Sequence, residues 1–287
     1  MSASNIRGVL AMLAAVGTFA IMDVTMKRLV EWYPAMQVTF LRGAASLPLL
    51  VGATALFGQW GDLIPRRWRL HIARGLLSVL VLWLFVFSVK RLSLADAYSI
   101  FMSAPLLITA LSVPLLREHV GWRRWLAVLV GLIGVLFVLK PTGTNWITLG
   151  GLAAFGAAIG YALNVLTIKM LARSDTGAAT VLWALTILTA VSGALAIPTW
   201  EAVRWQHAGW IALLGISGAL GQYLITYAFR CAAPSVLAPL EYTALAWGVL
   251  FDYVLWHTMP SARMLIGASI IVASGLYVLR RERLANR

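Results

Sequence analysis

Two stretches of the chain, 142 residues apart, share one pattern and decide the fold. Residues 8–27 read GVLAMLAAVGTFAIMDVTMK, and residues 150–169 read GGLAAFGAAIGYALNVLTIK. At this constant offset the two share their opening glycine, a leucine, three alanines, a threonine and the closing lysine. A second similar pair, GVLFVL at 134–139 and GLYVLR at 275–280, lies farther along each copy. A repeat at a fixed offset indicates an internal duplication.

The composition indicates that almost the whole chain lies in a membrane. Of 287 residues, 61% are hydrophobic and 11% are charged, and the mean hydropathy is +0.86. Soluble domains carry about 25% charged residues. This excludes a cytosolic enzyme and a disordered chain, and the single cysteine excludes a disulfide scaffold. At about 20 residues per crossing, the length allows up to about ten spans.

Apolar runs predict ten transmembrane helices. We expect two five-helix repeats, at 1–141 and 142–287, in an all-α polytopic membrane protein. Because five is odd, the second repeat enters the membrane from the opposite side and is inverted. The first span is expected to be a retained helix, since it has no clear signal-peptide cleavage site. The predicted spans are 7–29, 35–57, 71–89, 94–116, 122–139, 147–170, 178–199, 208–229, 234–256 and 262–280.

The formal charge of +13 is explained by membrane topology. With the N-terminus in the cytoplasm, inner segments hold fifteen lysines and arginines and outer segments hold seven. The positive-inside rule therefore predicts two cytoplasmic termini. A nucleic-acid binder would gather its basic residues on one solvated face, so no nucleic-acid partner is expected.

Several elements resemble a known family. They are Phe-Leu-Arg at 40–42, Ala-Asp-Ala at 95–97, Pro105, Leu-Arg-Glu at 116–118, and Gly-Val at 134–135. With the duplication, they resemble the EamA-type repeat of the drug/metabolite transporter (DMT) superfamily. The resemblance implies ten helices in a bacterial-type inner membrane and export of small metabolites, closest to the amino-acid exporters of the superfamily. His257 departs from the pattern, because the family often has a glutamate at that point.

Ionisable residues inside the spans are candidates for function, because burying a charge in a membrane is costly without a partner. Asp23 and Arg42 are predicted to form a structural ion pair between spans 1 and 2. Glu241 is predicted to bind a substrate ammonium group or a coupling proton, with a carboxylate hydrogen-bonded between helices as the alternative. Pro105 and Pro239 are hinge candidates, since proline bends a spanning helix.

Small polar and aromatic side chains at helical spacing predict the wall of a substrate cavity near the midplane. Helix packing is the alternative reading of each of them. Beside Glu241, the predicted cavity residues are Ser78, Leu82, Tyr98, Phe101, Met102, Asn164, Gln222, Thr226, Tyr242 and Trp247.

These patterns predict a secondary transporter that exports aromatic or neutral amino acids by alternating access. An importer of a small metabolite in the same fold stays open, because the sequence has no rule for direction. An intramembrane enzyme and a channel are disfavoured: catalytic motifs such as H-E-x-x-H and G-x-S-x-G are absent, and so is a filter signature. The expected partners are a small-molecule substrate and the lipid bilayer. We expect no cofactor, no metal and no obligate protein partner.

Overall fold

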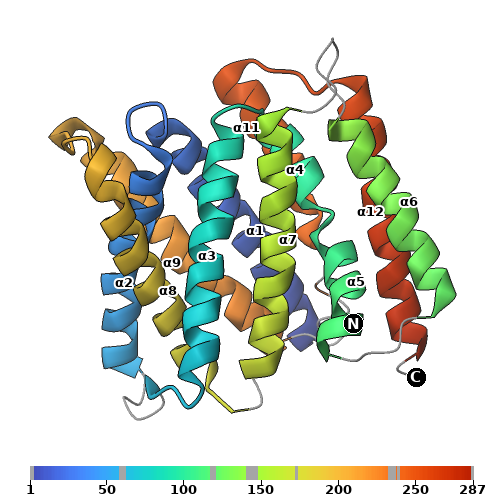
Figure 1. The fold of residues 1–287 in the computed structure, drawn as a ribbon, viewed down its shortest axis with the longest axis horizontal. Coiled ribbons are helices and arrows are strands. Elements are labelled where there is room, and N and C mark those ends of the chain that lie inside the picture. The colour runs from blue at the N-terminus through green and yellow to red at the C-terminus, as the bar shows by residue number, and fades with distance from the viewer. Residues whose placement is uncertain are drawn as a thin grey trace.

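The computed structural model describes residues 3–57, 63–116, 121–139, 148–171, 174–231, 237 and 240–285. Within these residues every regular element is a helix, and the helices run side by side in one bundle (Figure 1). The long helices are α1 (Ala3–Leu29), α2 (Ala35–Phe57), α3 (Trp68–Val89), α4 (Leu94–Phe101), α5 (Ala104–Leu116), α6 (Trp122–Leu139), α7 (Leu149–Leu171), α8 (Gly177–Ala196), α9 (Ala208–Cys231), α11 (Thr243–Trp256) and α12 (Ala262–Ala285).

The helices confirm a polytopic all-α membrane protein. Seven helical segments are long and apolar enough to cross a bilayer, and three shorter apolar helices accompany them. Together they coincide with the predicted spans, with ends shifted by a few residues, except that α11 covers only the second part of span 234–256, whose first residues lie largely outside the described part of the chain. The chain begins α1 and ends α12 at the same end of the bundle (Figure 1), called here the termini end. Which face of the membrane that end occupies stays a prediction, as does the division into repeats after residue 141.

Local chemistry sets the start of α4. Ser93 is the N-cap, and its hydroxyl accepts a hydrogen bond from the backbone N–H of Asp96. The same hydroxyl donates to the Asp96 carboxylate over 2.7 Å. This reciprocal cap satisfies donors that a helix start leaves unpaired, so Asp96 has a local structural role.

Two of the predicted spans are broken near their middle. Span 4 consists of α4 and α5, with Met102 and Ser103 as a turn between them. Span 9 has a turn at Tyr242, directly before α11. Pro105 therefore lies in the first turn of α5, where a missing N–H costs little, and the break precedes it. The expected bend is present in span 4, and its role as a hinge stays a prediction.

Several of the helices pair in a pattern that survives exchange of the two halves of the chain. The pairs α1–α9 and α2–α9 have the counterparts α7–α3 and α8–α3, and α1–α11 has the counterparts α7–α4 and α7–α5. The pairs α2–α8, α4–α11 and α6–α12 join each span to its own counterpart. In Figure 1, α6 and α12 form one edge of the bundle, and α2, α8 and α9 form the other. The interior thus lies between α1, α3, α4, α7, α9 and α11.

Close approach of α6 and α12 depends on glycine. A Cβ atom on Gly134 would lie 2.9 Å from the carbonyl oxygen of Gly267 and 3.0 Å from the Cβ of Ile270. Gly134→Leu should therefore lower the free energy of unfolding by about 1–3 kcal/mol, the usual cost of overpacking, because the backbone cannot yield. Thermal unfolding of the purified protein in detergent measures this. Gly52→Leu is the matched control, since nothing lies within 4 Å of its Cβ, and an equal loss in both variants would contradict the prediction.

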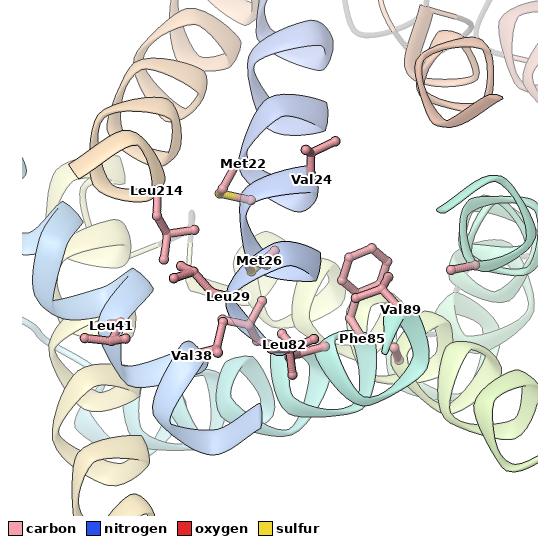
Figure 2. Packing of buried hydrophobic residues seen from close by; sticks show 14 of the residues in the cluster. Met22, Val24, Met26, Leu29, Val38, Leu41, Leu82, Phe85, Val89 and Leu214 are labelled. Atoms are coloured by element: carbon pink, nitrogen blue, oxygen red, sulfur yellow. The ribbon is translucent and has the colours of Figure 1, made fainter. Parts of the chain in front are cut away.

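The largest cluster of buried apolar side chains fills the half of the bundle opposite the termini end. It gathers residues from the last part of α1, the start of α2, the second half of α3 and the start of α4, together with single residues of α7, α8 and α9. Figure 2 shows these side chains pointing toward one another, and labels Met22, Val24, Met26, Leu29, Val38, Leu41, Leu82, Phe85, Val89 and Leu214. Dense packing therefore closes the interior at this end.

Candidate functional site

An acidic and a basic side chain meet in the interior on spans 1 and 2. The Asp23 carboxylate on α1 accepts a hydrogen bond of 2.6 Å from the Tyr98 hydroxyl on α4. The guanidinium of Arg42 on α2 directs its Nε to the sulfur of Met22, 3.3 Å away. Asp23 and Arg42 are close enough for each charge to act on the other. Two charged groups and a tyrosine hydroxyl, from three spans, thus lie beside the buried cluster.

The direct ion pair predicted between Asp23 and Arg42 is not formed. Within the described part of the chain, no nitrogen of Arg42 lies within 4.0 Å of the Asp23 carboxylate. The physical reason is packing: the Tyr98 hydroxyl fixes the carboxylate, and Arg42 precedes Gly43, which packs closely against Thr189 and Leu188 of α8. The prediction was wrong in geometry, although it named two residues that are neighbours.

The charged groups of Asp23 and Arg42 keep accessible polar atoms. Both residues are half-buried. The buried side-chain atoms without a partner belong to His71, Ser88 and Tyr242 among the described residues. The second carboxylate oxygen of Asp23 and the terminal nitrogens of Arg42 have no partner among the described residues and are not in that buried group. These atoms are therefore accessible.

Aromatic rings continue from this point across the interior. The ring of Tyr98 stacks on Phe85 with centroids 6.1 Å apart, and Phe85 meets Phe101 at 5.7 Å. Phe101 in turn lies 5.2 Å from Tyr161 on α7. Glu241 lies close enough to Tyr161 for its charge to act on the phenol. The row supplies flat apolar faces between two acidic residues.

Glu241 is a carboxylate without a protein partner. It makes no hydrogen bond or ion pair within the described ranges, although protein surrounds it closely and it is half-buried. It stands one residue before the turn at Tyr242, where span 9 is broken. The alternative of a carboxylate hydrogen-bonded between helices is therefore not what the described residues show. Its functional role stays a prediction.

A second polar cluster joins α3 to α7 and α8 nearer the termini end. The Nε of Arg74 donates to the side-chain oxygen of Asn164 over 3.2 Å, and Nη1 donates to the carbonyl oxygen of Thr180. The Asn164 amide donates to Ser78 over 2.8 Å. The predicted cavity residues Ser78 and Asn164 are thus brought together. Arg74 lies inside the predicted span 71–89 but was not named as a cavity residue, and its bond to Asn164 places it in this cluster.

A buried ion pair between α1 and α11 was not predicted from the sequence. Lys27 Nζ lies 3.0 Å from Asp252 Oδ1, and the two side chains are 12% and 2% exposed. The other oxygen of Asp252 accepts the backbone N–H of Ala95 over 2.7 Å. Lys27 also lies 4.4 Å from the ring centroid of Trp256. One carboxylate therefore ties together α1, α4 and α11 at the end opposite the termini.

Four of the remaining predicted cavity residues make packing contacts, and the structure gives little or nothing on the others. Leu82 is part of the buried cluster, and Met102 packs against the cluster between α6 and α12. Tyr242 points to α12, where a Cβ on Gly275 would touch its hydroxyl, so it is a packing residue. Trp247 packs on α1, 3.1 Å from the position of a Cβ on Gly17. Gln222 lies half-buried on α9; the side chain of Thr226 and all of Pro239 lie outside the described residues.

At the termini end, Asp175 gathers the start of α3 and the turn before α8. Its carboxylate accepts hydrogen bonds from the Arg66 backbone N–H at 2.6 Å, from the Ser174 hydroxyl at 2.5 Å, and lies 3.1 Å from His71 Nε2. Burial by itself would raise the pKa of Asp175, but the hydrogen bonds outweigh it and lower the pKa to about 2. The carboxylate therefore favours the folded state most when it is ionised.

Stability should depend on pH through Asp175. Because its pKa is lower in the folded than in the unfolded chain, its contribution is present above the ordinary value of 3.8 and is lost as the pH falls toward 2. Asp175→Asn should lower the thermal midpoint in detergent at neutral pH and should flatten its fall between neutral and acidic buffers. Glu201→Gln, on an exposed residue, is the control. Parallel acid profiles for Asp175→Asn and the unchanged chain would contradict this assignment.

Comparison with known proteins identifies relatives along nearly the whole chain. A model of the EamA-like transporter family matches residues 6–140. A riboflavin transporter of Vibrio cholerae is 28% identical over 98% of this chain and 96% of its own. An S-adenosylmethionine uptake transporter of Rickettsia bellii is 26% identical over 92% of this chain and 90% of its own. A solved crystal structure covers 99% of both chains with a TM-score of 0.66 and 19% identity, which shows a shared fold.

These relatives correct the expected substrate and direction. Their names specify riboflavin and S-adenosylmethionine; the two riboflavin transporters are named without a direction, and the S-adenosylmethionine transporter is named for uptake. Export of amino acids is therefore not supported, and the importer that the sequence left open fits better. The family resemblance itself is confirmed: residues 6–140 match the EamA-like transporter family, and the relatives that cover nearly the whole chain are named as transporters of small metabolites.

Proposed function

We propose that the protein takes up a metabolite with a planar nitrogen-heteroaromatic ring. Riboflavin and S-adenosylmethionine, the compounds named for its relatives, share such a ring and differ in most other groups. Phe101 and Tyr161, which are half-buried and whose ring centroids lie 5.2 Å apart, are the structural observation that carries the proposal. Stacked and edge-on aromatic faces bind flat rings and tolerate differences among them.

Alternating access between the two repeats, divided after residue 141, supplies the transport mechanism that we propose. The buried cluster closes the interior at the end opposite the termini, while Asp23, Arg42 and Glu241 remain partly accessible. If the termini are cytoplasmic, as the distribution of basic residues predicts, the structure is a conformation closed to the outside. The substrate then binds between the halves, as is common in transporters built from inverted repeats.

Transport assays with both ring systems test the proposal. Right-side-out vesicles containing the protein should accumulate radiolabelled riboflavin or S-adenosylmethionine above vesicles without it. Unlabelled compound of the same class should compete, and radiolabelled phenylalanine should not accumulate. Accumulation of phenylalanine alone, or of labelled heteroaromatic compound only in inverted vesicles, would overturn the proposal.

A further inference from the structure

The two charged side chains on spans 1 and 2 have unused hydrogen-bonding capacity. An ionised carboxylate offers about four lone-pair sites, and a guanidinium offers five N–H donors. Asp23 uses one bond, from the Tyr98 hydroxyl. Arg42 uses one N–H, on a thioether sulfur that is a weak acceptor. Such capacity inside a membrane is costly unless something else fills it.

Packing holds the two groups apart. The Tyr98 ring that fixes Asp23 is itself confined, because a Cβ on Gly248 of α11 would lie 2.6 Å from it and Phe85 stacks on its other side. Arg42 follows Leu41 of the buried cluster and precedes Gly43, whose Cβ position lies against Thr189 and Leu188 of α8. Neither backbone can shift freely to close the gap. The separation is therefore built into the fold.

We propose that Asp23 and Arg42 together bind one polar edge of the substrate, in which an N–H donor lies beside a carbonyl or carboxylate acceptor. The donor meets the Asp23 carboxylate, and the acceptor meets the unused N–H groups of Arg42. This inference rests on the proposed function, in which the ring lies against Phe101 and Tyr161. Tyr98 is a positioning residue, since its hydroxyl holds Asp23 while its ring is packed between Phe85 and Gly248.

Both ring compounds considered above carry such an edge. In riboflavin it is the imide of the pyrimidinedione ring, and in S-adenosylmethionine it is the ammonium and carboxylate of the methionyl group. Both compounds therefore offer a donor beside an acceptor, and a matched pair of ligands tests which group of each compound is recognised. For the imide the pair is riboflavin and its N3-methyl derivative, and for the methionyl group it is S-adenosylmethionine and 5′-methylthioadenosine.

The test changes one ligand group and one side chain, first separately and then together, and compares the effects on competition. In the unchanged protein, removing the donor edge should weaken competition against labelled substrate by about tenfold or more, as expected for a hydrogen bond to a charged group. In Asp23→Asn, which keeps an acceptor for Tyr98, the difference between riboflavin and its N3-methyl derivative should become much smaller, whereas the methionyl pair should keep the part of its difference that the carboxylate makes with Arg42. In Arg42→Lys, which keeps the positive charge but loses the paired N–H donors of the guanidinium, the KM for substrate should rise. Monodisperse elution in detergent establishes that each variant is folded.

Exposed residues of the same charge provide the controls. Glu31→Gln and Arg91→Gln alter residues at the bundle surface and should retain the full difference between the paired ligands. If Asp23→Asn also retains it, or if the unchanged protein shows no difference for either pair, the bridging role is wrong although the transport proposal stands. If neither labelled compound is transported or competes, both proposals fall together.

Discussion

Replacing Asp252 with leucine is expected to lower the free energy of unfolding by about 3–5 kcal/mol, the usual result of removing one partner of a buried ion pair. The substitution leaves the Lys27 ammonium, 12% exposed, without its counter-charge. It also leaves the backbone N–H of Ala95 without its acceptor. Chemical or thermal unfolding of the detergent-solubilised protein measures the loss, and the yield of monodisperse protein gives an independent reading.

A double variant separates the ion pair from its surroundings. Lys27→Met combined with Asp252→Leu removes both charges, so it should be more stable than Asp252→Leu alone, and the coupling is read from the double-mutant cycle. The exposed pair of Arg28 and Glu31, with side chains 44% and 39% exposed, is the matched control. Glu31→Leu should cost no more than about 1 kcal/mol. Equal losses of unfolding free energy for Asp252→Leu and Glu31→Leu would show that the buried ion pair stabilises the protein no more than the exposed one.

Changing Glu241 to glutamine is expected to reduce uptake by about tenfold or more and to remove its dependence on pH. The carboxylate has no partner among the described residues, so a proton or a cationic substrate group must neutralise it for burial to be tolerated. Glutamine keeps the shape but neither titrates nor carries charge. Initial rates of labelled substrate uptake across a series of buffers measure both effects.

The pH dependence, maximal rate and KM of Glu241→Gln together distinguish the two possible roles of Glu241. A loss of pH dependence with a lower maximal rate indicates proton coupling, whereas a raised KM for cationic but not neutral ligands indicates direct binding. Glu201→Gln, at an exposed acid outside the spans, should leave both properties unchanged. Unaltered uptake and unaltered pH dependence in Glu241→Gln would exclude both roles.

Hydropathy and the duplication were enough to predict the helices, because the membrane leaves few alternatives for an apolar chain. The predicted spans 35–57 and 122–139 coincide with α2 and α6. The breaks in spans 4 and 9 were predicted only in part, since the prolines indicated the region of each break but not the residues that form the turn. In span 4 the turn precedes Pro105, because a proline is well tolerated at the start of a helix.

Side-chain partners were harder to predict than helices. Asp23 and Arg42 were chosen as partners because a short loop joins their spans, but sequence distance does not report how each side chain is packed. The bond from Tyr98, 75 residues away, fixes the carboxylate. Lys27 and Asp252 are 225 residues apart, and both were visible as charges near span ends. Pairing them required knowing that α1 packs on α11, which periodicity within one helix does not contain.

The exchange of partners among the helices has a consequence for the conformation that the structure does not display. Several helix pairs have a counterpart in the other half of the chain, whereas pairs such as α2–α3 and α4–α12 have no comparable counterpart, and the buried cluster fills one end alone. The asymmetry therefore lies in some of the helix contacts as well as in the packing of side chains. Under the alternating access that we propose, the opposite conformation would have to release these unmatched contacts together with the buried cluster.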